Sequence, residues 1–324
     1  MSEFKKNWDS AFTSTELKGS NPSCPSYAGA LSFLRRRLSH NLEGVDVAVT
    51  GIPFDTATSN RPGARFGPRA LRSASSSFTW GRPWPWDFDP LEVLSIVDYG
   101  DCSFDYGDPE KIPATIEAHI SEIVSQGVAC FSLGGDHFVS YPALRAHAKV
   151  HGKLSLLHFD AHTDTWADNG ERVDHGTMFY RATLDGIVDP ESSVQIGIRT
   201  TNDDTLGFNV LDANWVHERG IEATVKRARE ILGDNKVYLT FDIDCLDPAF
   251  APGTGTPVCG GLTTHQALSI LRGMAGINLV GMDLVEVAPA YDSGEITAYA
   301  GVSLGVEFLC LYATRNGGIP PVSA

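Results

Sequence analysis

The sequence predicts an α/β protein whose core is an open, mostly parallel sheet with helices on both faces. Short apolar runs rich in β-branched residues recur along the chain and alternate with stretches whose apolar residues have helical spacing. The apolar runs are continuous, whereas strands with one face in water alternate apolar and polar residues. Strands buried on both faces and separated by helices are typical of a parallel sheet with crossover connections.

Each predicted strand is short and is bounded by Gly, Asp or Pro, which favour turns. The predicted helices lie between and after the strands. Pro113–Ser125 opens with Pro and stops before Gly127, as helices commonly do. Thr263 and Gln266 have capping-box spacing, which marks the start of a helix. In chain order the predicted strands are Val45–Ile52, Leu94–Val97, Val128–Leu133, Leu154–Phe159, Val194–Ile198, Val237–Phe241 and Leu279–Met282, and the other predicted helices are Tyr141–Val150, Glu222–Leu232 and Thr297–Leu311.

The domain organisation is predicted to be simple. Residues 1–40 are polar and contain the segment SNPSCPS, which favours an arm lying on the surface. No internal repeat and no composition typical of a linker follows. We therefore predict an N-terminal arm over residues 1–40 and a single catalytic domain over residues 41–324.

Composition excludes several classes of protein. Hydrophobic residues make up 42% of the chain and charged residues 20%, which predicts a sizeable buried core. The formal net charge of −15 disfavours binding to nucleic acid and to anionic membranes. The 6 cysteines form no CxxC pair, which favours a reducing compartment. Because the first residues lack the apolar core of a signal peptide and no apolar run approaches the roughly 20 residues of a membrane span, we expect a cytoplasmic protein.

Residues of the kinds that bind metals follow three of the predicted strands. They occur in the segments LGGDHFVSYP (133–142), LLHFDAHTD (156–164) and TFDIDCLDPAFAPGTGTP (240–257). Because ligands of open parallel sheets bind beyond the carboxyl ends of the strands, these segments are expected to meet. The two glycines before His137 allow a tight bend beside a ligand, although a histidine at this position can equally be structural.

Asp160, His162 and Asp164 occupy every second position directly after a predicted strand. In an extended chain, all three side chains point the same way. A row of such side chains would leave unpaired charge near the core unless cations bind there. His158 has the same parity but lies inside the strand, so we expect it to be a core histidine or one that supports the ligands.

Asp242 and Asp244 repeat this spacing at the end of another predicted strand. Two carboxylates at close range repel each other unless cations neutralise them, although the pair could also cap the following turn. The three segments together supply four carboxylates and two imidazoles, which suits two ions that share bridging carboxylates. An oxygen-rich set of ligands favours manganese or another hard cation over zinc. The expected ligands are His137, Asp160, His162, Asp164, Asp242 and Asp244.

The charge of this cluster points to a cationic substrate. Two dications and one bridging hydroxide would leave the four aspartates at a total of about −1. Such a hydroxide is a nucleophile at neutral pH. Glu286 follows the strand Leu279–Met282 and could bind a planar guanidinium through paired N–H groups, although a buried salt bridge is the alternative. His175 could carry a proton to a leaving amine, or it could be an ordinary loop histidine.

The three segments resemble, in order and separation, the signature segments of the arginase/agmatinase (ureohydrolase) family. The likeness extends from about Val45 to Leu311. It implies a three-layer αβα sandwich of the arginase/deacetylase-like kind, a binuclear Mn²⁺ site and a homotrimer or homohexamer. It also implies that His175 is the proton-shuttling histidine and that Glu286 binds the guanidinium. One Mn²⁺ would be held by His137, Asp160, Asp164 and Asp242, and the other by Asp160, His162, Asp242 and Asp244, so that Asp160 and Asp242 bridge the two.

Within the family, the segments DAHTDT, DHGTMF, TSNRPGARFGP and VEVAPAYD look most like those of bacterial agmatinases. Arginases resemble one another in DxN and SGN residues that hold the α-carboxylate and α-amine of arginine. Here Asp164 is followed by Thr165 and Trp166, and the loop reaches His175 as RVDHG. The Asn and the Ser-Gly-Asn that hold arginine are therefore missing. The resemblance therefore implies agmatine as substrate, with putrescine and urea released after attack of a metal-bridging hydroxide on the guanidinium carbon.

Several alternatives stay open. Guanidinobutyrate or guanidinopropionate would fit a pocket with a cation at its mouth, for which Arg61 and Arg172 are candidates. An amide hydrolase of the deacetylase kind would use one zinc and fewer aspartates, and a non-catalytic metal-binding protein would release no urea. The ammonium end of agmatine could be faced by Asp168, Glu171 or Asp174, although a solvated acidic loop explains these residues as well.

Overall fold

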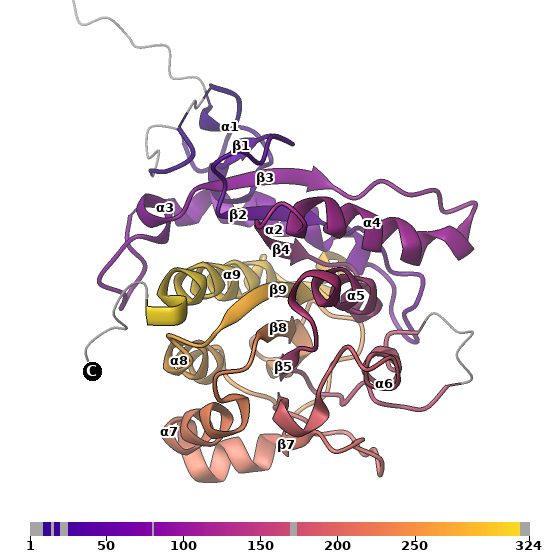
Figure 1. Ribbon diagram of the computed structural model, residues 1–324. Coiled ribbons are helices and arrows are strands. Elements are labelled where there is room, and N and C mark those ends of the chain that lie inside the picture. The colour runs from indigo at the N-terminus through magenta and orange to yellow at the C-terminus, as the bar shows by residue number, and fades with distance from the viewer. Residues whose placement is uncertain (1–8, 14–15, 20–24, 80, 169–173, 318–324) are drawn as a thin grey trace, which may run out of the picture.

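One parallel sheet forms the centre of the molecule, as the sequence predicts (Figure 1). The computed structural model describes residues 9–13, 16–19, 25–79, 81–168 and 174–317. Over these residues, nine strands pair in the order β1-β3-β2-β4-β9-β8-β5-β6-β7. Their bounds are Arg37–Leu38 (β1), Val47–Gly51 (β2), Ile96–Asp101 (β3), Ala129–Leu133 (β4), Ser155–Phe159 (β5), Val194–Ile196 (β6), Asn209–Leu211 (β7), Val237–Asp242 (β8) and Leu279–Val285 (β9).

Helices cover both faces of the sheet and make it a three-layer αβα sandwich (Figure 1). On one face, α4 packs on α5 and α5 on α6. On the other face, α2, α3 and α8 pack on α9, and α7 packs on α8. The helices are Ser10–Thr13 (α1), Gly67–Ser75 (α2), Pro90–Val93 (α3), Ile112–Val124 (α4), Ser140–His151 (α5), Met178–Leu184 (α6), Ala213–Leu232 (α7), Thr264–Gly273 (α8) and Ile296–Thr314 (α9).

Two hydrophobic clusters lie on opposite faces of the sheet. Successive strand residues contribute to different clusters, since Phe131 of β4 belongs to one and Cys130 to the other. This two-residue alternation is what a strand buried on both faces requires. Among the described helices, α9 alone is long and apolar enough to cross a membrane, but 83% of its apolar stretch is buried inside the protein. Its apolar character is therefore explained by its place in the core.

The predicted strands all appear, and the structure adds two that the sequence did not reveal. These are β1 and β7, which have two and three residues and lie at the edges of the sheet. Edge strands this short carry no apolar run. Helix α7 begins at Ala213, earlier than the predicted start at Glu222, and its backbone departs from helical values at Gly220. Strand β1 lies within residues 1–40 and pairs with β3, whereas the division into arm and domain stays a prediction.

The turn after β4 ties three parts of the chain together. Gly134 donates its N–H to the carbonyl of Leu284 in β9, and the carbonyl of Gly135 accepts from Glu286. Asp136 donates its N–H to the carbonyl of Phe54. A Cβ atom on Gly135 would lie 1.6 Å from that carbonyl oxygen, so only glycine fits between the two backbones.

We predict that Gly135→Ala destabilises the protein because a backbone atom blocks the added methyl group. The free energy of unfolding should fall by about 3 kcal/mol or more, the upper end for overpacking. Gly44→Ala is the control, since Gly44 has a positive φ but open space, and it should cost only about 1–2 kcal/mol of strain. Chemical denaturation of both variants measures the difference, and equal losses would contradict the steric argument.

Candidate functional site

The predicted metal ligands follow three strands that lie close together in the sheet. The order β4-β9-β8-β5 brings the ends of these strands side by side. Residues at the ends of β4 and β5 and next to the ends of β9 and β8 form one row across the sheet, because Leu133 pairs with Leu284, Leu284 with Phe241, and Phe241 with Phe159. Side chains immediately after this row therefore meet at the carboxyl edge.

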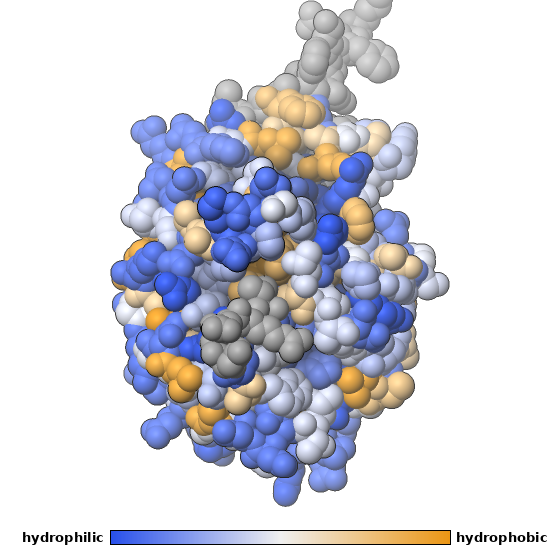
Figure 2. Space-filling view, turned by 90° about the vertical axis from the view of Figure 1, so that its right-hand side faces the viewer, coloured by the Kyte–Doolittle hydropathy of each residue, from blue (hydrophilic) through white to orange (hydrophobic). Residues whose placement is uncertain are grey.

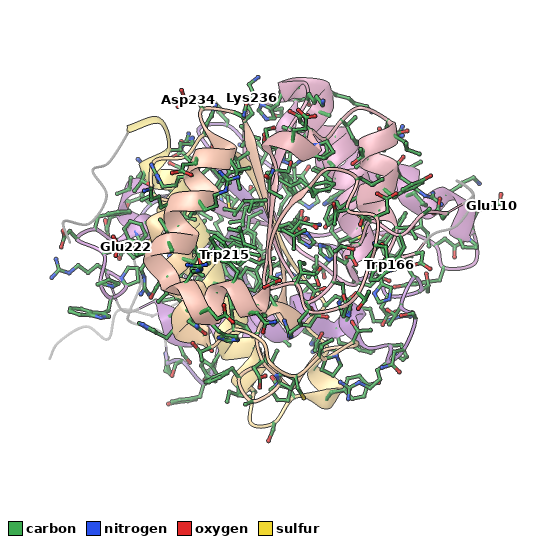
Figure 3. The ribbon with its side chains drawn as sticks, turned by 90° about the horizontal axis from the view of Figure 1, so that it is seen from below. Glu110, Trp166, Trp215, Glu222, Asp234 and Lys236 are labelled. Atoms are coloured by element: carbon green, nitrogen blue, oxygen red, sulfur yellow. The ribbon has the colours of Figure 1, made fainter. Side chains whose placement is uncertain are left out.

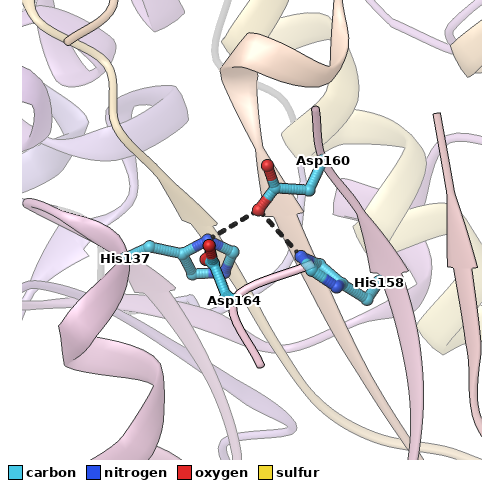
Figure 4. Close-up of side chains that lie close together, drawn as sticks. All are labelled: His137, His158, Asp160 and Asp164. Carbon is cyan, nitrogen blue, oxygen red and sulfur yellow. Dashed lines mark hydrogen bonds and ion pairs between the residues drawn. The ribbon is translucent and has the colours of Figure 1, made fainter. Parts of the chain in front are cut away.

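The first half of the cluster surrounds His137, which opens a short 3-10 helix after β4. Its Nδ1 atom lies 3.0 Å from an oxygen of Asp160, 3.0 Å from Asp164 and 3.3 Å from Asp242. Figure 4 shows His137, Asp160 and Asp164 turned toward one another. The other ring nitrogen, Nε2, lies 2.9 Å from the Thr240 hydroxyl, which fixes the ring orientation.

The second half of the cluster surrounds His162. Its Nδ1 atom lies 3.2 Å from Asp160 Oδ1 and 3.2 Å from Asp244 Oδ2. Asp244 Oδ2 also accepts a hydrogen bond from the Thr256 hydroxyl at 3.1 Å. Asp160 therefore contacts both histidines, one through each of its oxygens, as a carboxylate shared between two sites does.

The predicted ligand side chains meet in the structure, but the extended geometry from which they were predicted is only partly right. The chain after β5 is not extended, because Asp164 has a positive φ of 52°. Asp160 and Asp164 consequently reach His137, while His162 turns toward Asp244. The capping role considered for Asp242 also exists, since its Oδ1 atom accepts the Asp244 N–H at 2.8 Å.

Burial makes this concentration of charge energetically costly without cations. Asp160 and Asp244 are fully buried, and Asp164 and Asp242 nearly so. Burial and the neighbouring charges of Asp244 and Asp160 raise the pKa of Asp242 well above its usual value. Burial alone would lower the pKa of His162, but the charge of Asp244 and bonds to Asp160 and Asp244 raise it to about 12. The buried carboxylates thus favour the protonated, positively charged form of His162.

The donor set fits divalent cations. Three carboxylate oxygens converge on His137 Nδ1, yet this buried atom forms no hydrogen bond of acceptable geometry within the described part of the chain. Several of these ligand atoms lie within 4.8 Å of one another in two groups that share Asp160. Oxygen and imidazole ligands in two adjoining groups suit hard dications such as Mn²⁺.

Two further predicted residues meet beside the cluster. His175 Nδ1 lies 2.8 Å from Glu286 Oε1, and His175 Nε2 lies 2.8 Å from the Ser59 hydroxyl. Glu286 follows β9 in a left-handed conformation with φ 62°, and its Oε1 atom accepts the backbone N–H of His137. Its second oxygen, Oε2, is buried and has no hydrogen-bond partner among the described residues. A buried carboxylate oxygen without a donor is suited to accept one from a ligand.

Sequence analysis missed some residues of the site. Asp136 is fully buried, and its oxygens accept the N–H groups of Ala57 and Phe138, so it holds the loop that carries Ser59. Burial and the charge of Glu286 raise the pKa of Asp136 well above its usual value. An Asp directly before a helical start is a known N-cap signal and could have indicated this role. Ser59 carried no comparable signal, since only the fold brings it to His175.

A pocket of about 580 Å³ opens onto the cluster. Ser59, His162, Asp164, His175 and Asp242 are among the residues that line it, together with Trp166, Asp168, Asp174 and Thr177. Trp166 follows β5 and Asp242 ends β8, and Figure 3 shows Trp166 toward the same side of the molecule as Glu110, which follows β3. The pocket therefore lies at the carboxyl edge of the sheet. Figure 2 shows that the face on this side is largely hydrophilic.

No arginine or lysine lines this pocket among the residues that the structure describes. Arg61 is engaged elsewhere, because its guanidinium donates to the carbonyls of Thr254 and Gly255 and stacks on Tyr291. Asp168 forms an ion pair with Arg181 at 2.6 Å, and Asp174 accepts the Gly176 N–H. Glu171 and Arg172, the other candidates for the far end of the substrate, lie outside the described residues.

Comparison with known proteins identifies the family. The family model described as the arginase family matches residues 45–310. The chain belongs to the arginase family. It is 55% identical over 292 residues, 90% of this chain and 91% of the other, to an agmatinase of Chromobacterium violaceum. A family match over most of the chain makes it a hydrolase of this metalloenzyme family.

Solved structures of arginase-family enzymes have the same fold. A crystal structure of a hypothetical agmatinase from Burkholderia thailandensis is 54% identical, with a TM-score of 0.92 over 94% of this chain and 97% of the other. Proclavaminate amidino hydrolase from Streptomyces clavuligerus is 39% identical, with a TM-score of 0.83 over 90% of this chain and 99% of the other. The predicted fold class and family are thereby confirmed.

The contact between His175 and Glu286 generates a prediction about pH. Burial would lower the pKa of His175, but the bond to Glu286 and the charges of Glu286, Asp164 and Asp136 raise it to about 9. In metal-free protein, Glu286→Gln should bring this pKa back toward or below the usual value of about 6.5. Histidine resonances followed by NMR measure the shift.

The same bond predicts how stability depends on pH. Because the pKa of His175 is raised in the folded protein, the contribution of this bond to the free energy of unfolding is complete below about pH 6.5 and is lost as pH rises through about 9.

Glu43→Gln, at an exposed position, is the control for the NMR titration and should leave the pKa of His175 unchanged. A His175 pKa that stays near 9 without the Glu286 charge would contradict this assignment.

Proposed function

We propose that this chain is an agmatinase that hydrolyses agmatine to putrescine and urea with two Mn²⁺ ions. One observation carries the proposal: four buried aspartates and two histidines meet beside Glu286, and His162, Asp164 and Asp242 of this cluster line a pocket that no described arginine or lysine lines. Relatives at 55% and 53% identity are named agmatinases, which agrees with the site. The cytoplasmic location and the homotrimer or homohexamer inferred from the sequence belong to the same proposal.

The ligand assignment follows the two halves of the cluster. His137, Asp160, Asp164 and Asp242 would hold one ion, and Asp160, His162, Asp242 and Asp244 the other. The shared position of Asp160 between His137 and His162 supports its bridging role. Bound there, two dications supply a Lewis acid and a source of hydroxide at neutral pH.

Glu286 is the group that would bind the guanidinium. The backbone N–H of His137 and the ring of His175 fix Oε1 in place, while Oε2 is buried without a partner among the described residues. A guanidinium offers paired N–H donors that match a carboxylate. Its charge would also compensate Glu286, which the fold buries almost completely.

His175 is placed to deliver a proton to the departing amine. It lies at the wall of the pocket, and Glu286 and Ser59 hold its two ring nitrogens. The backbone N–H of Ser59 donates to His175 Nε2 at 3.0 Å, so in this state Nε2 accepts and the ring proton is on Nδ1, facing Glu286. Nε2 would have to release this contact and take up a proton, which the charge of Glu286 favours, before it could donate. If the leaving nitrogen took the place of Ser59 at His175 Nε2, the ring could donate its proton to that nitrogen.

The pocket favours agmatine over substrates that end in a carboxylate. Guanidino acids need a cation at the far end, and the candidate Arg61 is bound to backbone carbonyls instead. Asp168 is paired with Arg181, so the acidic character of the outer wall comes from Asp174. Coulomb attraction therefore favours an ammonium group at this end.

A urea-release assay with added Mn²⁺ tests the choice of substrate. We expect agmatine to be hydrolysed with a specificity constant at least about 100-fold above those of arginine, guanidinobutyrate and guanidinopropionate, which is the cost of one misplaced charge of about 3 kcal/mol. A preference for a guanidino acid would reject agmatine, and bound metal with no urea from any of the four would reject an enzyme of this class.

Asp160→Asn tests the metal assignment. Loss of a shared ligand should lower Mn²⁺ affinity and urea release by more than about 100-fold, since even a supporting partner of a ligand costs 10–100-fold. His175→Ala is the matched control: it should slow turnover by about 100-fold or more and leave two ions bound. Metal analysis and urea assays separate the two effects. Near-normal activity of the Asp160 variant would reject the assignment.

A further inference from the structure

Behind Asp160, two buried side chains face each other across adjacent strands. His158 of β5 and Gln195 of β6 are register partners in the sheet, and both are fully buried. His158 Nε2 lies 2.8 Å from Asp160 Oδ2, and His158 Nδ1 lies 3.0 Å from Gln195 Nε2. Figure 4 shows His158 and His137 approaching the same oxygen of Asp160. By distance alone, His158 could also belong to the metal-binding group, so its role has to be decided by its protonation.

A backbone carbonyl fixes the orientation of the Gln195 amide. Gln195 Nε2 lies 2.7 Å from the carbonyl oxygen of Thr163, which can only accept a hydrogen bond. If the amide were reversed, two oxygens would lie at this distance and repel each other. The amide oxygen, Oε1, has no hydrogen-bond partner within the described residues, so the contact with the Thr163 carbonyl is what fixes the orientation.

This orientation determines which nitrogen of His158 carries the proton. One hydrogen of the Gln195 amino group is used by Thr163, and the other points to His158 Nδ1. Nδ1 must therefore be the acceptor, and the proton of the neutral ring is on Nε2. The N–H at Nε2 then donates to Asp160 Oδ2. A ring nitrogen that carries a proton has no lone pair for a metal ion.

Aromatic packing keeps the ring in this position. The rings of His158 and Phe179 meet edge-on with centroids 4.6 Å apart, and those of His158 and His137 with centroids 5.3 Å apart. Rotation of the ring would break both contacts and both hydrogen bonds. The Nε2–H group consequently has a fixed direction toward the carboxylate.

We propose that Gln195 and His158 form a positioning relay that holds the Asp160 carboxylate for two cations, and that His158 is not itself a metal ligand. The inference rests on the proposed function, because it assumes that Asp160 binds metal. Thr163 orients Gln195, Gln195 sets the tautomer of His158, and His158 occupies one lone pair of Asp160 Oδ2. The remaining lone pairs of Asp160 are thereby directed toward the two halves of the cluster.

Nitrogen NMR of the imidazole rings tests the tautomer directly. In metal-free protein and in protein loaded with diamagnetic Zn²⁺, His158 should show a protonated Nε2 and an unprotonated Nδ1 at neutral pH. His158→Phe identifies its signals by their loss. An unprotonated Nε2 in either sample would overturn the relay and make His158 a candidate ligand.

Mn²⁺ titrations, followed by calorimetry, test what the relay does. His158→Phe removes the donor and should raise the Kd for Mn²⁺ by about 10–100-fold, and Gln195→Met by about 10-fold, as loss of partners behind a ligand does. His158→Gln keeps an N–H donor near the former Nε2 position and should restore most of the affinity. No rescue by His158→Gln, or unchanged affinity in His158→Phe, would contradict the proposal.

Ser193→Ala is the control for a general loss of buried hydrogen bonds. Ser193 lies two residues before Gln195, and its hydroxyl accepts from the Leu156 N–H and donates to the Asp189 carbonyl, so its loss also costs two hydrogen bonds, one buried and one partly buried. It should lower stability while leaving the Kd for Mn²⁺ unchanged. An equal effect of Ser193→Ala and Gln195→Met on Mn²⁺ binding would contradict the relay, because any buried hydrogen bond in this region would then have the same influence.

The test also distinguishes this inference from the proposed function. If the unaltered protein binds two Mn²⁺ and releases urea while the relay variants behave normally, the inference alone fails. If the unaltered protein binds no Mn²⁺ at the cluster, the proposed function fails first.

Discussion

The concentration of buried negative charge at the carboxyl edge of the sheet is the constraint on which the rest of the structure depends. Asp160, Asp164, Asp242 and Asp244 are at most 4% exposed and lie within hydrogen-bond range of the same two histidines. Carboxylates removed from water are strongly unfavourable unless cations or directed donors compensate them. Two histidines offset only part of this charge. The arrangement therefore suits a binding site for dications and, beside them, for a cationic substrate.

The parallel sheet provides the means of holding such a cluster. Four adjacent strands end in one row, so their following residues meet without long loops. The Gly134–Gly135 turn packs the backbone of His137 against β9 and Phe54, and Asp136 fastens the loop that reaches His175 through Ser59. Behind the candidate ligands, the buried side chains of Thr240 and Gln195 contact the rings of His137 and His158. Rigid elements thus supply the precision that a metal site requires.

The sequence predicted the central strands and the six candidate ligands because both are local signals. Continuous apolar runs mark strands buried on both faces, and charged residues directly after them stand out. Strands β1 and β7 were missed because their few residues gain regularity only from a neighbouring strand. Ser59, Thr240 and Gln195 were missed because an isolated hydroxyl or amide has no signature until the fold supplies its partner. The positive φ of Asp164 was equally hidden, so the spacing indicated side chains that do meet, but through an extended geometry that the chain does not adopt.

Anomalous X-ray diffraction from crystals grown with Mn²⁺ tests the central claim most directly. The account predicts two manganese peaks in each chain, one beside His137 and Asp164 and one beside His162 and Asp244, with Asp160 and Asp242 between them. His158 should contact Asp160 and neither ion. A single peak, or manganese bound to His158 in place of His137 or His162, would contradict the account.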